Sequence, residues 1–172
     1  RTKGIIALQL ALIVIGGGWY IKSGCDFGKE EAIHYDRLAF RCQWEEIIEQ
    51  AEKKMPSTPQ SVTCLNLALG MTGQLSDRMF EFYQNGPIGL IYPFSRNVVS
   101  SLCSSEVHYQ LGMINAAQQI TFEVMASTPN NLQNARCIRR LAETNLVNGQ
   151  YEVAAKHLRT LQKTIYYKRW AN

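Results

Sequence analysis

The chain has 172 residues, of which 46% are hydrophobic and 19% are charged, so it is long enough for a globular domain with a hydrophobic core. This composition excludes a disordered chain, a disulfide-dense miniprotein and a collagen-like repeat. The formal net charge of +4 is spread unevenly: residues 1–24 contribute +3, residues 25–130 contribute −5 and residues 131–172 contribute +6. Because the large central block is acidic, we expect no nucleic-acid partner.

The first element in chain order is an uncharged run over residues 4–21, interrupted only by Gln9. As a helix its 18 residues would extend about 27 Å, close to the thickness of a bilayer core. Trp19 and Tyr20 stand at its end, where aromatic rings favour the headgroup region. The pattern predicts a transmembrane helix with its flank over residues 1–24, followed by a second domain over residues 25–172.

Three other interpretations of this segment stay open: a cleaved signal peptide, a lipoprotein signal before Cys25, and a helix buried in a protein core. The chain starts at Arg1 without an initiator Met, so we expect it to continue a longer protein. The basic residues Arg1 and Lys3 precede the segment and place its start in the cytoplasm. The expected location is the bacterial inner (cytoplasmic) membrane, with the second domain on the extracytoplasmic side.

From Cys25 onward, hydrophobic residues recur at spacings of three and four without strict alternation, which predicts an all-α fold. Within this part, turn glycines recur at Gly73, Gly112 and Gly149, 39 and 37 residues apart. Cys42 takes the same place in a degenerate first copy, 31 residues before Gly73. Glycine adopts a left-handed backbone conformation without steric cost, so each position is expected to end one helix and reverse the chain.

A repeated tripeptide supports this register. Residues 57–59 and 127–129 both read Ser-Thr-Pro, 70 residues apart. A hydroxyl side chain followed by proline is typical of a helix N-cap and first turn. We therefore predict that a helix starts at each tripeptide.

The last unit, with Asn148-Gly149 followed by Tyr151, Ala154 and Leu158, resembles the tetratricopeptide pattern of glycine, aromatic, alanine and large apolar residue. The resemblance extends over about residues 30–164 and implies a right-handed array of about four antiparallel helix pairs. It also implies a groove lined by the first helix of each pair. On the last of these helices one face presents three candidate partner-binding residues: Arg136, Arg139 and Glu143.

Residues 83–94 break the helical pattern, because two glycines and two prolines stand among large apolar residues. This loop either folds back into the core of the array or docks a partner or a membrane surface. Under the second interpretation its partner-binding residues are Leu90, Tyr92 and Phe94.

The chain shows no pattern typical of catalysis, metal binding or cofactor binding. Its five cysteines include no CxxC pair, and their odd number argues against a disulfide framework. Cys64 and Cys103 each stand nine residues before a turn glycine, so we expect both to be small buried residues at equivalent repeat positions. We therefore predict no catalytic residue, no metal and no cofactor, and expect that this segment is not an enzyme.

Two functions remain. The first is a membrane-tethered helical-repeat scaffold on the cell envelope that binds a protein or peptide, with membrane contact through residues 4–21. The alternative is an envelope protein with the same fold that binds a ligand or glycan by stacking on Trp44, Tyr92 or Trp170.

The chain as a whole also resembles the C-terminal part of a family of multi-pass membrane proteins of unknown function from Bacteroidetes. The similarity is found in the hydrophobic segment that leads into a repeat domain, in the loop over residues 85–90, and in the tail over residues 163–171. The resemblance implies a membrane location and assigns no site residues.

Overall fold

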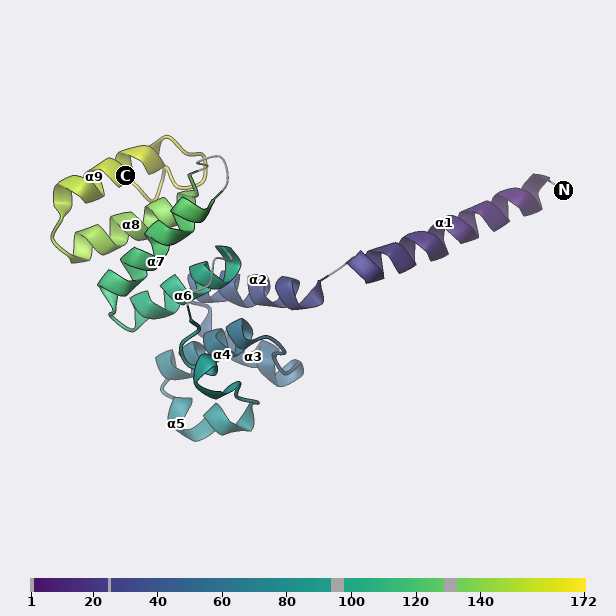
Figure 1. Cartoon of the computed structure of the whole chain (residues 1–172), viewed down its shortest axis with the longest axis horizontal. Coiled ribbons are helices and arrows are strands. Elements are labelled where there is room, and N and C mark those ends of the chain that lie inside the picture. The colour runs from purple at the N-terminus through teal and green to yellow at the C-terminus, as the bar shows by residue number, and fades with distance from the viewer. Residues whose placement is uncertain (1, 25, 94–97, 129–132) are drawn as a thin grey trace. The chain divides into compact units, whose positions relative to one another are not determined.

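A computed structural model describes residues 2–24, 26–93, 98–128 and 133–172, and every regular element in these ranges is a helix (Figure 1). The chain divides into two compact units, Arg1–Glu30 and Glu31–Asn172. The helices in order are α1 (Thr2–Gly24), α2 (Phe27–Phe40), α3 (Trp44–Lys53), α4 (Pro59–Met71), α5 (Leu75–Arg78), the 3-10 turns η1 (Met79–Glu81) and η2 (Gly86–Gly89), α6 (Val98–Gln110), α7 (Ile114–Ser127), α8 (Ala135–Val147) and α9 (Tyr151–Gln162). The predicted all-α class is confirmed.

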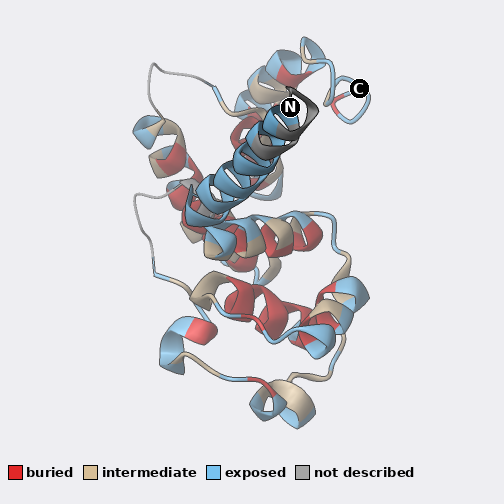
Figure 2. Ribbon diagram, turned by 90° about the vertical axis from the view of Figure 1, so that its right-hand side faces the viewer, coloured by how far each residue is buried: buried red, intermediate tan, exposed pale blue. Residues whose placement is uncertain are grey.

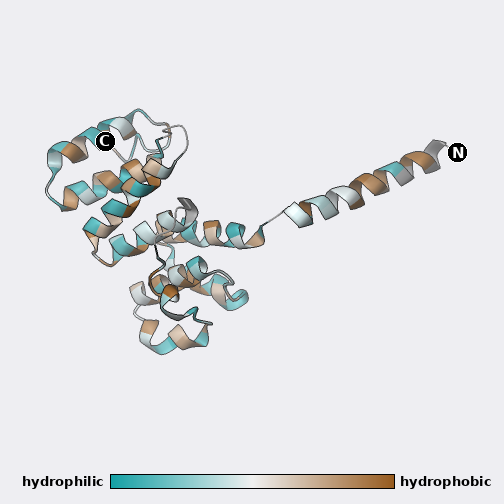
Figure 3. Cartoon of the chain, in the orientation of Figure 1, coloured by the Kyte–Doolittle hydropathy of each residue, from teal (hydrophilic) through white to brown (hydrophobic). Residues whose placement is uncertain are grey.

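Helix α1 confirms that residues 4–21 are helical. All side chains that the structure describes in α1 are exposed, whether they are apolar or polar (Figure 2). Hydrophobic residues are spread along the helix (Figure 3). Among the residues described, no helix combines the length and the apolarity that a membrane crossing requires. The prediction of a transmembrane helix is therefore not supported.

The predicted turn positions are confirmed by the backbone. Gly73, Gly112 and Gly149 have φ values of 74°, 76° and 72°, and Cys42 has a φ of 55°. These residues follow the ends of α4, α6, α8 and α2, so one left-handed residue reverses the chain at each place. Cys42 adopts this conformation although it has a Cβ atom, which makes it the structural equivalent of the glycines.

One of the two predicted helix starts is confirmed, and the first helical residue of the other lies outside the described residues. The Thr58 side chain accepts a hydrogen bond from the Ser61 backbone N–H, with Pro59 as the first residue of α4. Thr128, in contrast, is the C-terminal cap of α7, and Pro129 lies outside the described residues. Helix α8 starts at Ala135, where the Asn134 side chain accepts from the Arg136 N–H at 2.9 Å. A side chain caps a helix where it can accept a hydrogen bond from the free N–H groups of the first turn.

The core of the Glu31–Asn172 unit is built from adjacent helices. Helix α6 packs against α7, α8 packs against α9, and α7 packs against α8. Helix α4 packs against both α3 and α6. Among the described residues, a large cluster of buried side chains joins α2, α3, α4 and α6, and includes Tyr35, Ile47, Leu65 and Cys103.

The second predicted pair differs from the others. Its second helix, α5, has only four residues, and the 3-10 turns η1 and η2 follow it. Gly86 with a φ of 66° and Pro87 occupy this stretch, and neither suits the interior of a helix. The unit therefore has paired helices with an irregular connection between α4 and α6.

Candidate functional site

A group of six charged side chains gathers where α2, α6 and α8 meet. We call it the arginine–carboxylate cluster, and its members are Asp36, Glu106, Arg136, Arg139, Arg140 and Glu143. Asp36 comes from α2, Glu106 from α6, and the other four from α8. The cluster thus joins first helices of three predicted pairs and has as many positive as negative groups.

Each arginine of the cluster has a carboxylate partner. Arg136 pairs with both oxygens of Asp36, and its Nη2 donates to Oδ1 at 2.9 Å. Arg140 pairs with Glu106, and its Nη1 lies 2.8 Å from Oε2 of Glu143. Arg139 Nε donates to Oε1 of Glu143 at 2.8 Å. Paired arginine–carboxylate contacts are among the stronger hydrogen bonds in proteins.

Aromatic rings cover the same arginines. The Arg136 and Arg139 guanidinium groups lie 4.4 Å and 4.8 Å from the centre of the Phe40 ring. Arg139 also lies 4.7 Å from the Trp170 ring, and Arg140 lies 3.8 Å from the Tyr109 ring. The flat guanidinium group stacks on such rings while its edge keeps its hydrogen bonds.

These contacts change the protonation equilibria around the cluster. Burial opposes the charge of Arg136, but its hydrogen bonds to the Asp36 carboxylate and the negative charges of Asp36 and Glu106 outweigh this effect, so the pKa of Arg136 is raised. Burial, together with the nearby Glu143 carboxylate, raises the pKa of Tyr109. Arg136 therefore stays charged, and the Tyr109 phenol stays protonated at neutral pH.

The cluster brings together the three residues predicted to line a partner groove, Arg136, Arg139 and Glu143, but it gives each of them a partner inside the chain. A partner protein would have to break these ion pairs before it could use the same groups. The geometry therefore indicates that the cluster holds three helices together.

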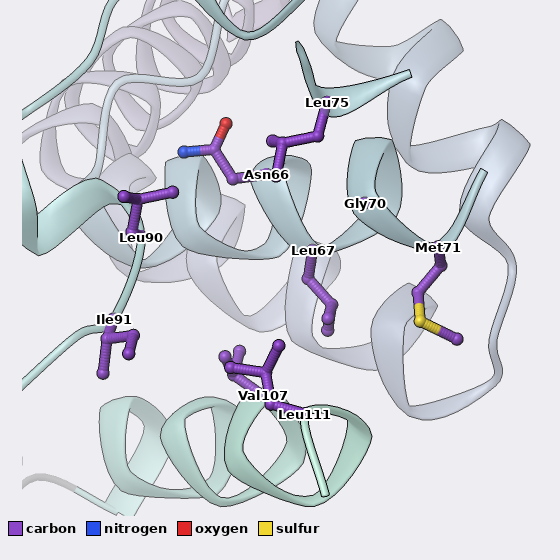
Figure 4. A pocket seen from close by; sticks show the side chains of 9 residues that line it. All are labelled: Asn66, Leu67, Gly70, Met71, Leu75, Leu90, Ile91, Val107 and Leu111. Atoms are coloured by element: carbon purple, nitrogen blue, oxygen red, sulfur yellow. The ribbon is translucent and has the colours of Figure 1, made fainter. Parts of the chain in front are cut away.

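A second feature is an open apolar cavity of about 380 Å³ between α4 and α6 (Figure 4). Nine residues line it: Asn66, Leu67, Gly70, Met71, Leu75, Leu90, Ile91, Val107 and Leu111. Leu67 from α4 and Val107 from α6 point into the space between these two helices (Figure 4). The volume lies in the range of ligand-binding pockets in proteins, about 300–1,000 Å³.

The loop over residues 84–91 closes one side of the cavity and is held to α4 by hydrogen bonds to its backbone and to the Gln84 side chain. Asn66 Nδ2 donates to the Gly89 carbonyl at 2.8 Å and to Gln84 Oε1 at 2.7 Å. Thr63 Oγ1 lies 3.0 Å from the Ile88 carbonyl oxygen and donates to it. Gly89 is buried against this surface, since a Cβ atom there would lie 3.1 Å from Gln84 Oε1. These contacts fix the positions of the residues that follow Gly89.

The outcome for the predicted loop residues is mixed. Leu90 lines the cavity and is 44% exposed, and its neighbour Ile91 also lines it and is 43% exposed. Tyr92 is half-buried outside the cavity lining, and its carbonyl accepts a hydrogen bond from Ser104 Oγ at 3.1 Å. Phe94 lies outside the described residues. The loop backbone folds back onto α4, while two apolar side chains remain partly open to solvent.

The three aromatic residues considered for glycan stacking do not meet in one place. Trp44 packs against the large core cluster, and Trp170 lies beside Arg139. None of the three, including Tyr92, lines the apolar cavity. Within the described ranges, no group of three or more histidine, cysteine or acidic side chains is arranged to hold a metal ion.

Sequence reasoning missed Asp36, Glu106 and Arg140, the buried half of the cluster. A signal was present for Asp36, because it stands four residues after Ala32 on the buried face of a predicted helix. A charged residue on such a face is buried only with a partner, although the spacing does not say which one.

Comparison with curated proteins and with solved structures found no match. The sequence does match one family, described as a family of unknown function (DUF6057), over residues 2–172. Because the match includes almost every residue, the chain belongs to the family of unknown function DUF6057.

Proposed function

We propose that the Glu31–Asn172 unit is a tetratricopeptide-like interaction domain that binds an apolar segment of a partner protein at the cavity between α4 and α6. The observation that supports this most directly is the open apolar cavity with its partly exposed leucine, isoleucine and methionine side chains. Apolar side chains of a docked helix or strand would fill such a cavity and cover its rim.

The repeat part of the proposal is supported by the turns and the packing. Left-handed residues stand after α2, α4, α6 and α8, and consecutive helices pack together at α6/α7 and α8/α9. Tetratricopeptide-like arrays bind partners along the surface of their first helices. In this chain one of those helices, α4, supplies four of the nine lining residues, and Val107 of α6 and Leu111 directly after α6 supply two more.

We propose the cavity, and not the arginine–carboxylate cluster, as the binding site because the side chains of the cluster are already paired, whereas those of the cavity are partly exposed. The arginines and carboxylates of the cluster already have partners, so a ligand gains little by replacing them. Met71, Leu90 and Leu111 at the cavity have large exposed apolar surface, and its burial is favourable by about 25 cal/mol per Å². A protein partner is favoured over a glycan because, among the described residues, no aromatic ring lines the cavity.

We also propose that the domain is held at the bacterial inner membrane, on its extracytoplasmic side, through α1. The apolar side chains described in α1, such as Ile13 and Val14, are exposed and need an apolar cover. Replacing Ile13 and Val14 by Asp should move the protein from the membrane fraction to the supernatant. Wild-type protein that is already in the supernatant would contradict the membrane proposal and leave the cavity proposal unaffected.

The cavity proposal is tested by photo-crosslinking in intact cells. A benzophenone amino acid at Ile91 should form a crosslink to one specific protein, identified by mass spectrometry. Leu111→Asp should lower the yield of this crosslink at least tenfold, since a carboxylate at the rim would have to be desolvated on binding.

The matched control is Val147→Asp. Leu111 and Val147 both lie near the end of a first helix and are 54% and 59% exposed, but only Leu111 lines the cavity. Equal loss in both variants would contradict the proposal. Saturable binding of a glycan without any protein crosslink would favour the ligand-binding function instead.

A further inference from the structure

Two buried cysteines face each other between α4 and α6. The Sγ atoms of Cys64 and Cys103 lie 2.9 Å apart, and both residues are 1% exposed. A disulfide bond measures about 2.04 Å, and non-bonded carbon atoms are in best contact at about 3.5–4.0 Å. The two thiols therefore point directly at each other, with no side chain between them.

The cysteine pair adjoins the apolar cavity. Cys64 precedes Leu67 by three residues on α4, and Cys103 precedes Val107 by four residues on α6. At these spacings residues share a helix face, and all four belong to the same cluster of buried side chains. Leu67 and Val107 belong to the two facing walls of the cavity (Figure 4). A link between the sulfur atoms would thus join these walls.

We propose that Cys64 and Cys103 form an intrachain disulfide bond that joins α4 to α6 and sets the width of the apolar cavity. The two cysteines are 39 positions apart in the sequence, so the bond closes a loop that includes α5, η1 and η2. This connection is the irregular part of the unit. The formation of the disulfide bond does not depend on the proposed function. Its effect on the width of the cavity matters only if the cavity binds a partner protein, and this part rests on the proposed function.

The reaction requires a disulfide as the oxidant, either a small one such as glutathione disulfide or the disulfide of an oxidoreductase. One cysteine thiolate attacks a sulfur of the oxidant, which releases the first thiol and forms a mixed disulfide. The second cysteine thiolate then attacks the first cysteine's sulfur and releases the second thiol. The two cysteines lose two electrons and two protons, and the oxidant's S–S bond is reduced to two thiols.

The surroundings of the pair determine when the bond forms. Its hydrogen bond with Cys103 and its burial raise the pKa of the Cys64 thiol, so the reactive thiolate is scarce in the folded chain. Oxidation therefore occurs during folding, before the pair is enclosed. Once formed, the bond is shielded from reductants by the same burial.

The test uses the whole chain, unfolded under reducing conditions and refolded with reduced and oxidised glutathione. N-ethylmaleimide is then added in denaturant, and the digest is analysed by mass spectrometry. We expect the peptides of Cys64 and Cys103 to be joined by a disulfide and unlabelled, with the other three cysteines, Cys25, Cys42 and Cys137, alkylated. The oxidised protein should melt on the order of 10 °C higher than the reduced protein, because the unfolded chain has lost the freedom of a long loop.

Two variants provide the controls. Cys103→Ser should abolish the joined peptides, leave Cys64 alkylated and remove the melting difference between oxidised and reduced protein. Cys137→Ser should retain the disulfide, because Cys137 is equally buried but has no sulfur contact in the described part of the chain. Complete alkylation of Cys64 and Cys103 in refolded wild-type protein, or a disulfide between other cysteines, would overturn the proposal. Neither result affects the crosslinking test of the cavity.

Discussion

Glu106 is the residue at which the role of the arginine–carboxylate cluster can be tested most directly. Its side chain is buried on α6, pairs with Arg140 and lies 4.0 Å from Arg136. Its other oxygen accepts a hydrogen bond from Gln110 Nε2 at 3.0 Å. Glu106→Gln keeps the shape and one carbonyl acceptor but removes the negative charge that faces two arginines.

The expected loss of stability follows from burial and from the remaining partners. Removing one member of a buried ion pair costs about 3–5 kcal/mol, because the other charge stays buried without compensation. Here Arg136 keeps Asp36, and Arg140 keeps Glu143. We therefore expect a loss at the lower end, about 3 kcal/mol in the free energy of unfolding. For a domain of this size, this corresponds to a melting temperature about 6–12 °C lower.

Urea unfolding followed by circular dichroism measures this loss. The matched control is Glu49→Gln, which removes an exposed carboxylate 3.7 Å from Lys53 and should cost less than about 1 kcal/mol. Combining Glu106→Gln with Arg140→Gln should cost less than the sum of the two single changes, since both remove the same ion pair. A loss below about 1 kcal/mol for Glu106→Gln, or strictly additive losses, would refute the reasoning.

Three further predictions concern caps, turns and pH. Asn134→Ala should destabilise by about 1 kcal/mol in thermal melting, because it removes the N-cap of α8, whereas the neighbouring exposed Gln133→Ala should have no measurable effect. Gly149→Ala should lower the free energy of unfolding by about 1 kcal/mol, because φ at this position is 72°. Gly70→Ala within α4 should not destabilise the protein, since the new Cβ atom would meet only Leu75 at 3.9 Å. Equal effects of the two substitutions would contradict the assigned turn. Burial lowers the pKa of His157 below 6.5, so protonation favours the unfolded chain and stability should fall as the pH drops through and below this value. His157→Gln should flatten that part of the stability curve, and an unchanged curve would contradict the assignment.

Several features followed from the sequence alone because they depend on neighbouring residues. The left-handed turns at Gly112 and Gly149 result from local sterics, and the cap at Thr58 from a side chain three residues before the N–H it binds. The all-α class followed from the spacing of hydrophobic residues. The equivalent positions of Cys64 and Cys103 were also visible, although the sequence indicated only that both are buried.

The tertiary structure alone decided which distant groups meet. Arg136 and Asp36 are 100 positions apart, and nothing in the spacing of either helix names the other as its partner. The same holds for the two sulfur atoms and for the cavity, whose walls come from separate helices and a loop. Periodicity determines which residues share a face of one helix. The partner across that face is set by how the helices pack, which depends on contacts far apart in the chain.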